Sequence, residues 1–260
     1  MKIVVKVGSS TLTYKTGNLN IRRVEQLCKV LADIKNAGNN VILVSSGAIA
    51  MGVGKLGLSR KPDDIPGKQA AAAVGQCELM YVYDKMFSQY NHVTGQILLT
   101  GEDVNHKKRF QNFTNTITRM LDLGILPIIN ENDTISTKEI KIGDNDTLSA
   151  LVARSVGADL LVLLTDREGL YTADPTKNPD ARLIKCVQKI TPEILDLAGD
   201  TAGTQGTGGM RTKLEAAELS MEAGINMVIA SGSRPEILYD IVEGRDFTGT
   251  FFDASEGRGR

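Results

Sequence analysis

Two stretches of this chain combine residues that could hold a phosphate group. Early in the sequence, Lys6 interrupts an apolar run, and Gly8-Ser9-Ser10 follows with consecutive backbone N–H groups and hydroxyls. Taken alone, that stretch would by default be an edge-strand lysine with its head in solvent, followed by an ordinary turn. Late in the sequence, GTGGMRTK (206–213) sets Arg211 and Lys213 behind a run of glycines. The late stretch fits neither the P-loop nor the Gly-x-Gly-x-x-Gly dinucleotide pattern.

Further polar groups follow other apolar runs. Ser45-Ser46-Gly47 stands at a predicted strand-to-helix turn, where backbone N–H groups stabilise a carboxylate or phosphate. A plain helix N-cap at Ser46 would explain the same residues. The segments NENDT (130–134) and GDNDT (143–147) gather carboxylates and amides without the spacing of an EF-hand. One such cluster could be turns and caps, but two suggest a pocket that holds an ammonium group, orients lysines or binds a metal.

Histidine is absent from all of these segments. The chain has two histidines, His92 and His106, and neither follows a predicted strand, so we expect both at the surface. Phosphorylation of a hydroxyl usually needs a base that accepts its proton. A carboxylate acceptor, with a pKa of about 4.3 for glutamate, is already ionised at neutral pH. Lysines without a histidine therefore favour an acid as the acceptor, although Asp146 remains a candidate base.

These residues need a scaffold that brings them together, and strand-like apolar runs alternate with segments of helical period along the chain. The alternation predicts an α/β fold with a mainly parallel sheet between layers of helices. Ligands of such sheets bind beyond the carboxyl ends of the strands, which is where the polar clusters fall. Strands are predicted at 3–7, 41–44, 96–99, 126–129, 160–164 and 227–230. Helices are predicted at 21–37, from 47, at 67–90, 113–123 and 146–156, from 210, and at 237–242.

Composition narrows the class of protein. The 260 residues carry a net charge of −1, which argues against a protein that coats nucleic acid or an anionic membrane. No apolar run approaches the length of a membrane span, and Lys6 breaks the apolar N-terminal run before it resembles a signal peptide. The three cysteines form no CxxC pair, so we expect them to be small buried residues in a reducing compartment: Cys28, Cys77 and Cys186. We expect a single cytoplasmic domain.

Six motifs in order resemble the glutamate 5-kinase branch of the amino acid kinase family, from the first strand to about Phe252. They are VVKVGSS, VSSGAIA, INENDT, KIGDNDTLSA, LLTDREGLYTADP and GTGGMRTK. The resemblance implies a three-layer α/β/α sandwich with an open, mainly parallel central sheet. Its substrate-binding half would span about 1–157 and its nucleotide-binding half about 158–260. The implied reaction is ATP-dependent phosphorylation of the γ-carboxylate of L-glutamate to γ-glutamyl phosphate, the first step of proline biosynthesis, with Mg²⁺ bridging the phosphates.

The resemblance also implies roles for individual residues. Lys6 and Lys213 would neutralise charge on the transferred phosphoryl group, and Asp146 would hold both lysines in place. The expected glutamate-binding positions are Ser46, Gly47, Asp133 and Asn145. The expected nucleotide-binding positions are Lys6, Gly8, Ser9, Thr165, Asp166, Thr207, Gly208, Gly209, Met210, Arg211, Thr212 and Lys213. No metal ligand is assigned.

Several properties of the family are expectations here. Many members carry a C-terminal PUA domain of RNA-binding type, and we expect none in a sequence that ends at Arg260. We also expect a homo-oligomer that binds no nucleic acid, and inhibition by proline at the glutamate site. Whether the acyl phosphate passes directly to glutamate-5-semialdehyde dehydrogenase stays open.

Two other readings stay open at this point. The same fold could act on carbamate, acetylglutamate, aspartate or UMP, although SSGAIA and INEND favour glutamate. The chain could also be a nucleotide-binding sensor or storage protein without catalysis, although the presence of Lys6, Asp146 and Lys213 together favours an enzyme.

Overall fold

The computed structural model describes residues 1–14, 16–136, 144–198 and 209–255. The chain divides into two compact units. Val7–Ile142 is called the N-terminal unit, and Met1–Lys6 together with Gly143–Arg260 is called the C-terminal unit. No helix in the described part of the chain is long and apolar enough to span a lipid bilayer.

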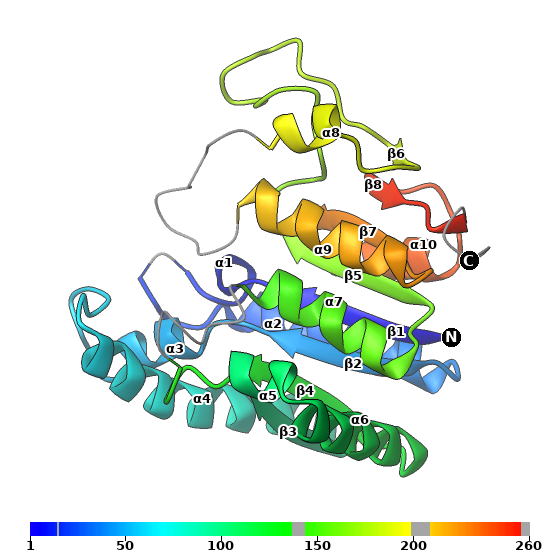
Figure 1. Cartoon of the computed structure of the whole chain (residues 1–260). Helices are drawn as coiled ribbons and strands as arrows, with labels where there is room; N and C mark the ends of the chain where they lie inside the picture. The colour runs from blue at the N-terminus through cyan, green and yellow to red at the C-terminus, as the bar shows by residue number, and fades with distance from the viewer. Residues whose placement is uncertain (15, 137–143, 199–208, 256–260) are drawn as a thin grey trace. The chain divides into compact units, whose positions relative to one another are not determined.

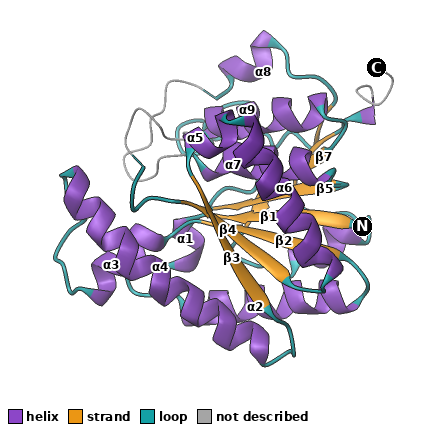
Figure 2. Cartoon of the chain, turned by 60° about the horizontal axis from the view of Figure 1, so that its bottom comes forward, coloured by secondary structure: helices purple, strands orange, loops and turns teal. Residues whose placement is uncertain are grey.

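The N-terminal unit is built on three parallel strands with helices on both faces. In spatial order the strands are β3 (Thr94–Leu99), β4 (Leu126–Glu131) and β2 (Asn40–Ser45). Its helices are α1 (Ser9–Leu12), α2 (Ile21–Asn36), α3 (Ala48–Lys55), α4 (Ile65–Ser88), α5 (Gly101–Asn105) and α6 (Lys107–Asp122). Figure 2 shows α6 on one face of the strands and α2 with α4 on the other. The central strand β4 is buried along its whole length because both of its faces are covered.

The C-terminal unit has a mixed set of strands. In spatial order they are β1 (Lys2–Val7), β5 (Leu160–Thr165), β7 (Asn226–Ser231), β8 (Gly249–Phe252) and β6 (Cys186–Val187). Strands β5 and β7 are parallel, and β8 is antiparallel to β7. The helices are α7 (Asn145–Val156), α8 (Pro192–Asp196), α9 (Met210–Glu222) and α10 (Ile237–Val242). Helices α7 and α9 pack side by side, α7 also against β5 and α9 against β7 (Figure 1).

The α/β class and the mainly parallel sheet predicted from the sequence are confirmed. All six predicted strands are present, within two residues at each end. The prediction missed the short elements α1, α5, α8, β6 and β8, and it started α6 six residues late, at Phe113. The short elements have two to five residues, too few for an apolar period to develop, and α6 begins with three basic residues.

Helices α3 and α4 approach each other so closely that glycine is required at two contacts. A Cβ atom on Gly52 would lie 1.8 Å from the carbonyl oxygen of Ala71, and one on Gly75 would lie 1.8 Å from that of Ala48. Both distances are far below van der Waals contact, and the obstacle in each case is backbone. The small residues on this face of α4 therefore serve packing within the unit.

We expect Gly75→Ala to destabilise the chain. Alanine is the better helix former by up to about 1 kcal/mol, but its methyl group would displace the first turn of α3. The net loss should be about 1–3 kcal/mol of unfolding free energy, measured by urea denaturation. Ala73→Ser adds one atom on the exposed side of the same helix and should change the free energy by less than about 0.5 kcal/mol. Equal stability of the two variants would contradict this account of the contact.

Candidate functional site

Three charged side chains meet in the interior of the C-terminal unit. Asp146 Oδ1 lies 2.6 Å from Lys6 Nζ, and Asp146 Oδ2 lies 3.0 Å from Lys213 Nζ. Asp146 has no exposed surface, and Lys6 and Lys213 are only 6% and 7% exposed. Lys6 at the end of β1 is thus not a solvated edge-strand lysine. One carboxylate holds two ammonium groups that are more than 200 positions apart in the sequence.

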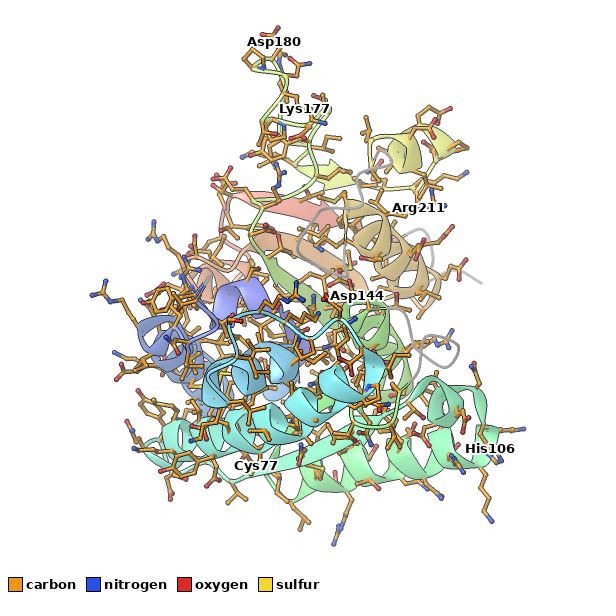
Figure 3. All side chains as sticks on the ribbon, turned by 90° about the vertical axis from the view of Figure 1, so that its left-hand side faces the viewer. Cys77, His106, Asp144, Lys177, Asp180 and Arg211 are labelled. Atoms are coloured by element: carbon orange, nitrogen blue, oxygen red, sulfur yellow. The ribbon has the colours of Figure 1, made fainter. Side chains whose placement is uncertain are left out.

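The start of helix α7 fixes the carboxylate. Asp144 is the N-cap of α7, and its side chain accepts a hydrogen bond from the backbone N–H of Asp146 at 3.2 Å. The hydroxyl of Thr212 lies 3.2 Å from Asp144 Oδ2 and 3.1 Å from Asp146 Oδ2, so it ties the first turn of α9 to the first turn of α7. Asp144 also lies 4.0 Å from Lys6 Nζ. Figure 3 labels Asp144 among these interior side chains.

Asp144 was not among the predicted site residues, although the structure places it in the cluster. The segment GDNDT did carry a signal, since Asp before an apolar helical segment is a typical N-cap. Which of its two aspartates would cap the helix depends on where α7 begins, and the prediction placed that start at Asp146, one residue late.

The cluster contains two positive and two negative groups, so its formal charge is zero. Burial alone would raise the pKa of Asp146, but the charges of Lys6 and Lys213 and their hydrogen bonds outweigh burial and hold that pKa below its ordinary value of 3.8. Asp146 is therefore a carboxylate at neutral pH. Both of its oxygens face ammonium groups, which orients the two lysines.

Other predicted nucleotide-binding residues lie at or near the ends of β5 and α9. Thr165 ends β5 opposite Ser231 of β7, and its hydroxyl accepts a hydrogen bond from the backbone N–H of Arg167 at 2.9 Å. Asp166, the next residue, is exposed. Gly209 caps α9 and Met210 begins it, both half-buried. Thr207 and Gly208 lie outside the described residues.

Arg211 does not join the buried cluster. Its side chain is exposed and pairs with Glu215 one helical turn later, at 3.2 Å. Figure 3 shows Arg211 at the start of α9, and Lys177 and Asp180 at the tip of the long loop that follows β5. Of the four residues Met210–Lys213, the structure brings Thr212 and Lys213 into contact with Asp146.

A hollow in the N-terminal unit contains one of the predicted glutamate-binding residues, Asp133. It is a shallow depression, and its empty space of about 150 Å³ includes open solvent. Its wall is held by a buried amide pair, because Asn130 Nδ2 donates to Gln76 Oε1 at 2.9 Å and Asn130 Oδ1 accepts from the backbone N–H of Glu131 at 2.8 Å. The lining residues are Ala48, Ala72, Gln76, Leu98, Glu131, Asn132, Asp133 and Thr134.

The turn between β2 and α3 adjoins this hollow through Ala48. Gly47 is the N-cap of α3 and has a φ of 109°, a conformation that favours glycine. Ser46 therefore does not cap the helix, and its backbone N–H donates to the carbonyl of Val7 at 3.1 Å. A Cβ atom on Gly47 would lie 3.9 Å from Cα of Ser9, so the two predicted N–H-rich turns are neighbours.

The predicted residues are divided between the units. Gly8 and Ser9, at the start of α1, belong to the N-terminal unit together with Ser46, Gly47 and Asp133. Asn145 is buried in the first turn of α7 and belongs to the C-terminal unit.

The histidines and two of the cysteines belong to the N-terminal unit, and Cys186 belongs to the C-terminal unit. His106 is exposed before α6, as Figure 3 shows, and His92 is half-buried with Nε2 3.2 Å from the carbonyl oxygen of Ala32. Cys28 is buried as predicted, and burial raises the pKa of its thiol. The prediction of burial is wrong for Cys77, on the outer side of α4, and for Cys186, on the edge strand β6.

The fold and the buried Lys–Asp–Lys cluster define an α/β protein with two oriented lysines at the ends of its strands and helices, and comparison with known proteins shows its family. Residues 1–231 match the amino acid kinase family. The chain belongs to that family.

Sequence relatives are close. The chain is 56% identical over 252 residues to a glutamate 5-kinase of Clostridium tetani, covering 97% of this chain and 94% of the relative. It is 51% identical to a glutamate 5-kinase of Moorella thermoacetica, covering 99% of this chain and 68% of that longer relative.

Solved structures share the fold at low identity. An isopentenyl phosphate kinase of T. acidophilum matches with a TM-score of 0.66 and 18% identity, covering 97% of this chain and 100% of that one. A carbamate kinase of Giardia lamblia matches with a TM-score of 0.66 and 22% identity, covering 97% and 98%.

Replacing Asp146 by asparagine should destabilise the chain strongly at neutral pH, by about 3–5 kcal/mol, because it removes the carboxylate that both buried lysines contact. The pKa of Asp146 is lower in the folded chain than in the unfolded one, so its stabilisation is present above pH 4 and is lost as the pH falls through the folded pKa. The difference between the two proteins should therefore shrink from pH 7 to pH 3.

Chemical denaturation across this pH range measures the effect. Asp180→Asn, at an exposed site of the same unit, serves as the control and should cost less than about 0.5 kcal/mol at every pH. A cost for Asp146→Asn that is the same at pH 3 and pH 7 would argue against a charge-based role.

Proposed function

We propose that this chain transfers the γ-phosphoryl group of ATP to the γ-carboxylate of L-glutamate, giving γ-glutamyl phosphate and ADP, the first step of proline biosynthesis. The observation that carries this proposal is the placement of Lys6 and Lys213 on opposite oxygens of Asp146. The 56% identity to a protein named glutamate 5-kinase supports glutamate as the acceptor.

The chemistry makes modest demands on the protein. A carboxylate oxygen of glutamate forms the new P–O bond, the bond between the γ-phosphorus and the β–γ bridging oxygen breaks, and ADP leaves with that oxygen. The acceptor is ionised at neutral pH, so no proton has to be removed. Catalysis then rests on positioning and on stabilising charge on the phosphoryl oxygens, a task suited to two oriented ammonium groups.

The glutamate site is proposed in the hollow of the N-terminal unit. Asp133 supplies a carboxylate for the substrate ammonium group. The Ser46–Gly47 turn leads into the first turn of α3, whose N–H groups suit a substrate carboxylate. Asn145 is proposed as a further contact, from the first turn of α7.

The nucleotide site is proposed at the strand and helix ends of the C-terminal unit. We also propose a substrate-binding half at about 1–157 and a nucleotide-binding half at about 158–260. Its residues there are Lys6, Thr165, Asp166 and Gly209–Lys213. Gly8 and Ser9 are also proposed as nucleotide-binding residues. So are Thr207 and Gly208, which lie outside the described residues.

Magnesium is proposed to arrive with the nucleotide. Among the described residues no group of three or more His, Cys, Asp or Glu side chains could hold a metal ion. The described residues thus form no dedicated metal cage. Mg²⁺ in phosphoryl-transfer enzymes is commonly held largely by substrate phosphates and water, where it neutralises phosphate charge. Four further properties remain predictions: inhibition by proline, self-association, direct transfer of the acyl phosphate to a reductase, and a cytoplasmic location.

A hydroxylamine assay tests the function. The chain is incubated with ATP, Mg²⁺, hydroxylamine and one acid at a time, and hydroxamate is measured. We expect a signal with L-glutamate, because its acyl phosphate reacts with hydroxylamine. A signal only with aspartate, acetylglutamate or carbamate would assign another acceptor. Binding of ATP without hydroxamate from any acid would indicate a nucleotide sensor.

In the same assay Lys213→Ala should lower kcat by about 100-fold or more, with little change in the KM for glutamate, because the lysine interacts with charge on the phosphoryl group. Lys189→Ala removes an exposed lysine of the same unit and should retain wild-type kcat. A raised KM for glutamate at unchanged kcat would show that Lys213 acts in substrate binding instead.

A further inference from the structure

A buried pair of hydroxyl groups adjoins the turn that leads into α3. Tyr83 of α4 has no exposed surface, and its hydroxyl lies 2.8 Å from the hydroxyl of Ser45, the last residue of β2. Ser45 is also fully buried, and its hydroxyl donates to the backbone carbonyl of Ser46 at 3.1 Å. Tyr83 thus contacts Ser45, and Ser45 contacts the carbonyl of a predicted glutamate-binding residue.

The direction of these hydrogen bonds follows from proton counting. A serine hydroxyl carries one proton, and Ser45 gives it to the carbonyl of Ser46, so Ser45 accepts the proton of Tyr83. Burial raises the pKa of the Tyr83 hydroxyl, which therefore stays protonated as a donor. The order is Tyr83 O–H to Ser45 O–H to Ser46 C=O.

This chain of hydrogen bonds fixes the orientation of a peptide plane. The carbonyl of Ser46 and the N–H of Gly47 belong to the same planar trans peptide and point in opposite directions. A hydrogen bond that fixes the carbonyl of Ser46 on one side of the turn therefore directs the N–H of Gly47 to the opposite side. Gly47 has no Cβ atom and adopts a φ of 109°, so no side chain of its own restricts the orientation of this peptide. Ala48, the next residue, lines the hollow.

We infer that Tyr83 is a positioning residue for the glutamate site, acting through Ser45 on the Ser46–Gly47 peptide. The inference rests on the proposed function, since it assigns this turn to glutamate. Helix α4 then shapes the site at three successive points: Gly75 admits the carbonyl of Ala48, Gln76 holds Asn130, and Tyr83 orients the turn.

A purely structural role for the hydroxyl would have different consequences. The ring of Tyr83 fills the core and lies 6.3 Å from that of Phe87, and phenylalanine would fill the same space. Loss of the hydroxyl should therefore preserve the fold, although it removes one hydrogen bond. A structural role would lower the stability of the chain and affect the KM for glutamate and the KM for ATP alike. A positioning role would raise the KM for glutamate alone.

Tyr83→Phe should raise the KM for glutamate about 3- to 10-fold, the effect of losing one hydrogen bond, with kcat and the KM for ATP within about 2-fold of wild type. Tyr81→Phe removes a hydroxyl from the exposed side of the same helix and should leave all three constants unchanged. Ser45→Ala should reproduce the effect of Tyr83→Phe. The double variant should be no worse than either single one, because both break the same chain of hydrogen bonds.

The outcomes separate the inference from the function on which it rests. If wild type forms hydroxamate with glutamate and both Tyr83→Phe and Ser45→Ala keep its KM, the inference is overturned alone. An equal rise in the KM for glutamate and for ATP would also overturn it, because that result indicates general loosening. A wild-type chain inactive with glutamate would overturn the proposed function and this inference together.

Discussion

The contact of Asp146 with two lysines is the interaction that the rest of the C-terminal unit serves. Two ammonium groups buried in the interior are stabilised by the counter-charge of the carboxylate that both contact. Three elements meet at that counter-charge. The end of β1 carries Lys6, the first turn of α7 carries Asp146, and the first turn of α9 carries Lys213. The packing of α7 against α9, with Thr212 between their first turns, is what holds the three ends together.

The N-terminal unit reaches its geometry by backbone contact instead of charge. Gly52 and Gly75 let α3 and α4 touch along their backbones, which fixes the first turn of α3 against the helix that also carries Gln76. A contact of this kind has little tolerance, since any side chain beyond hydrogen at Gly75 collides with a carbonyl group. The hollow is thus bordered by elements whose backbones are in direct contact.

Much of this arrangement could be read from the sequence, because parallel sheets place ligands at strand ends and the unusual residues follow the strands. Lys6 and Lys213 could be singled out because each breaks a local pattern of apolar or small residues. The partnership of Thr212 with Asp144 could not, since a threonine in a helix gives no sign of what lies beside it. Arg211 looked equivalent to Lys213, but Glu215 four residues later offers it a partner on the helix surface. The exposed cysteines were missed because cysteine is usually buried whichever face of an element it occupies.

The electrostatics of the cluster also limit the kind of acceptor. Asp146 was a candidate base when only the sequence was considered, and a base would allow an alcohol as the acceptor. In the structure the pKa of Asp146 lies below its ordinary value, and each of its oxygens faces a lysine. A carboxylate of that kind is a weak base with no oxygen turned away from the lysines. The acceptor that suits this cluster is one that arrives already ionised, as a carboxylate does at neutral pH.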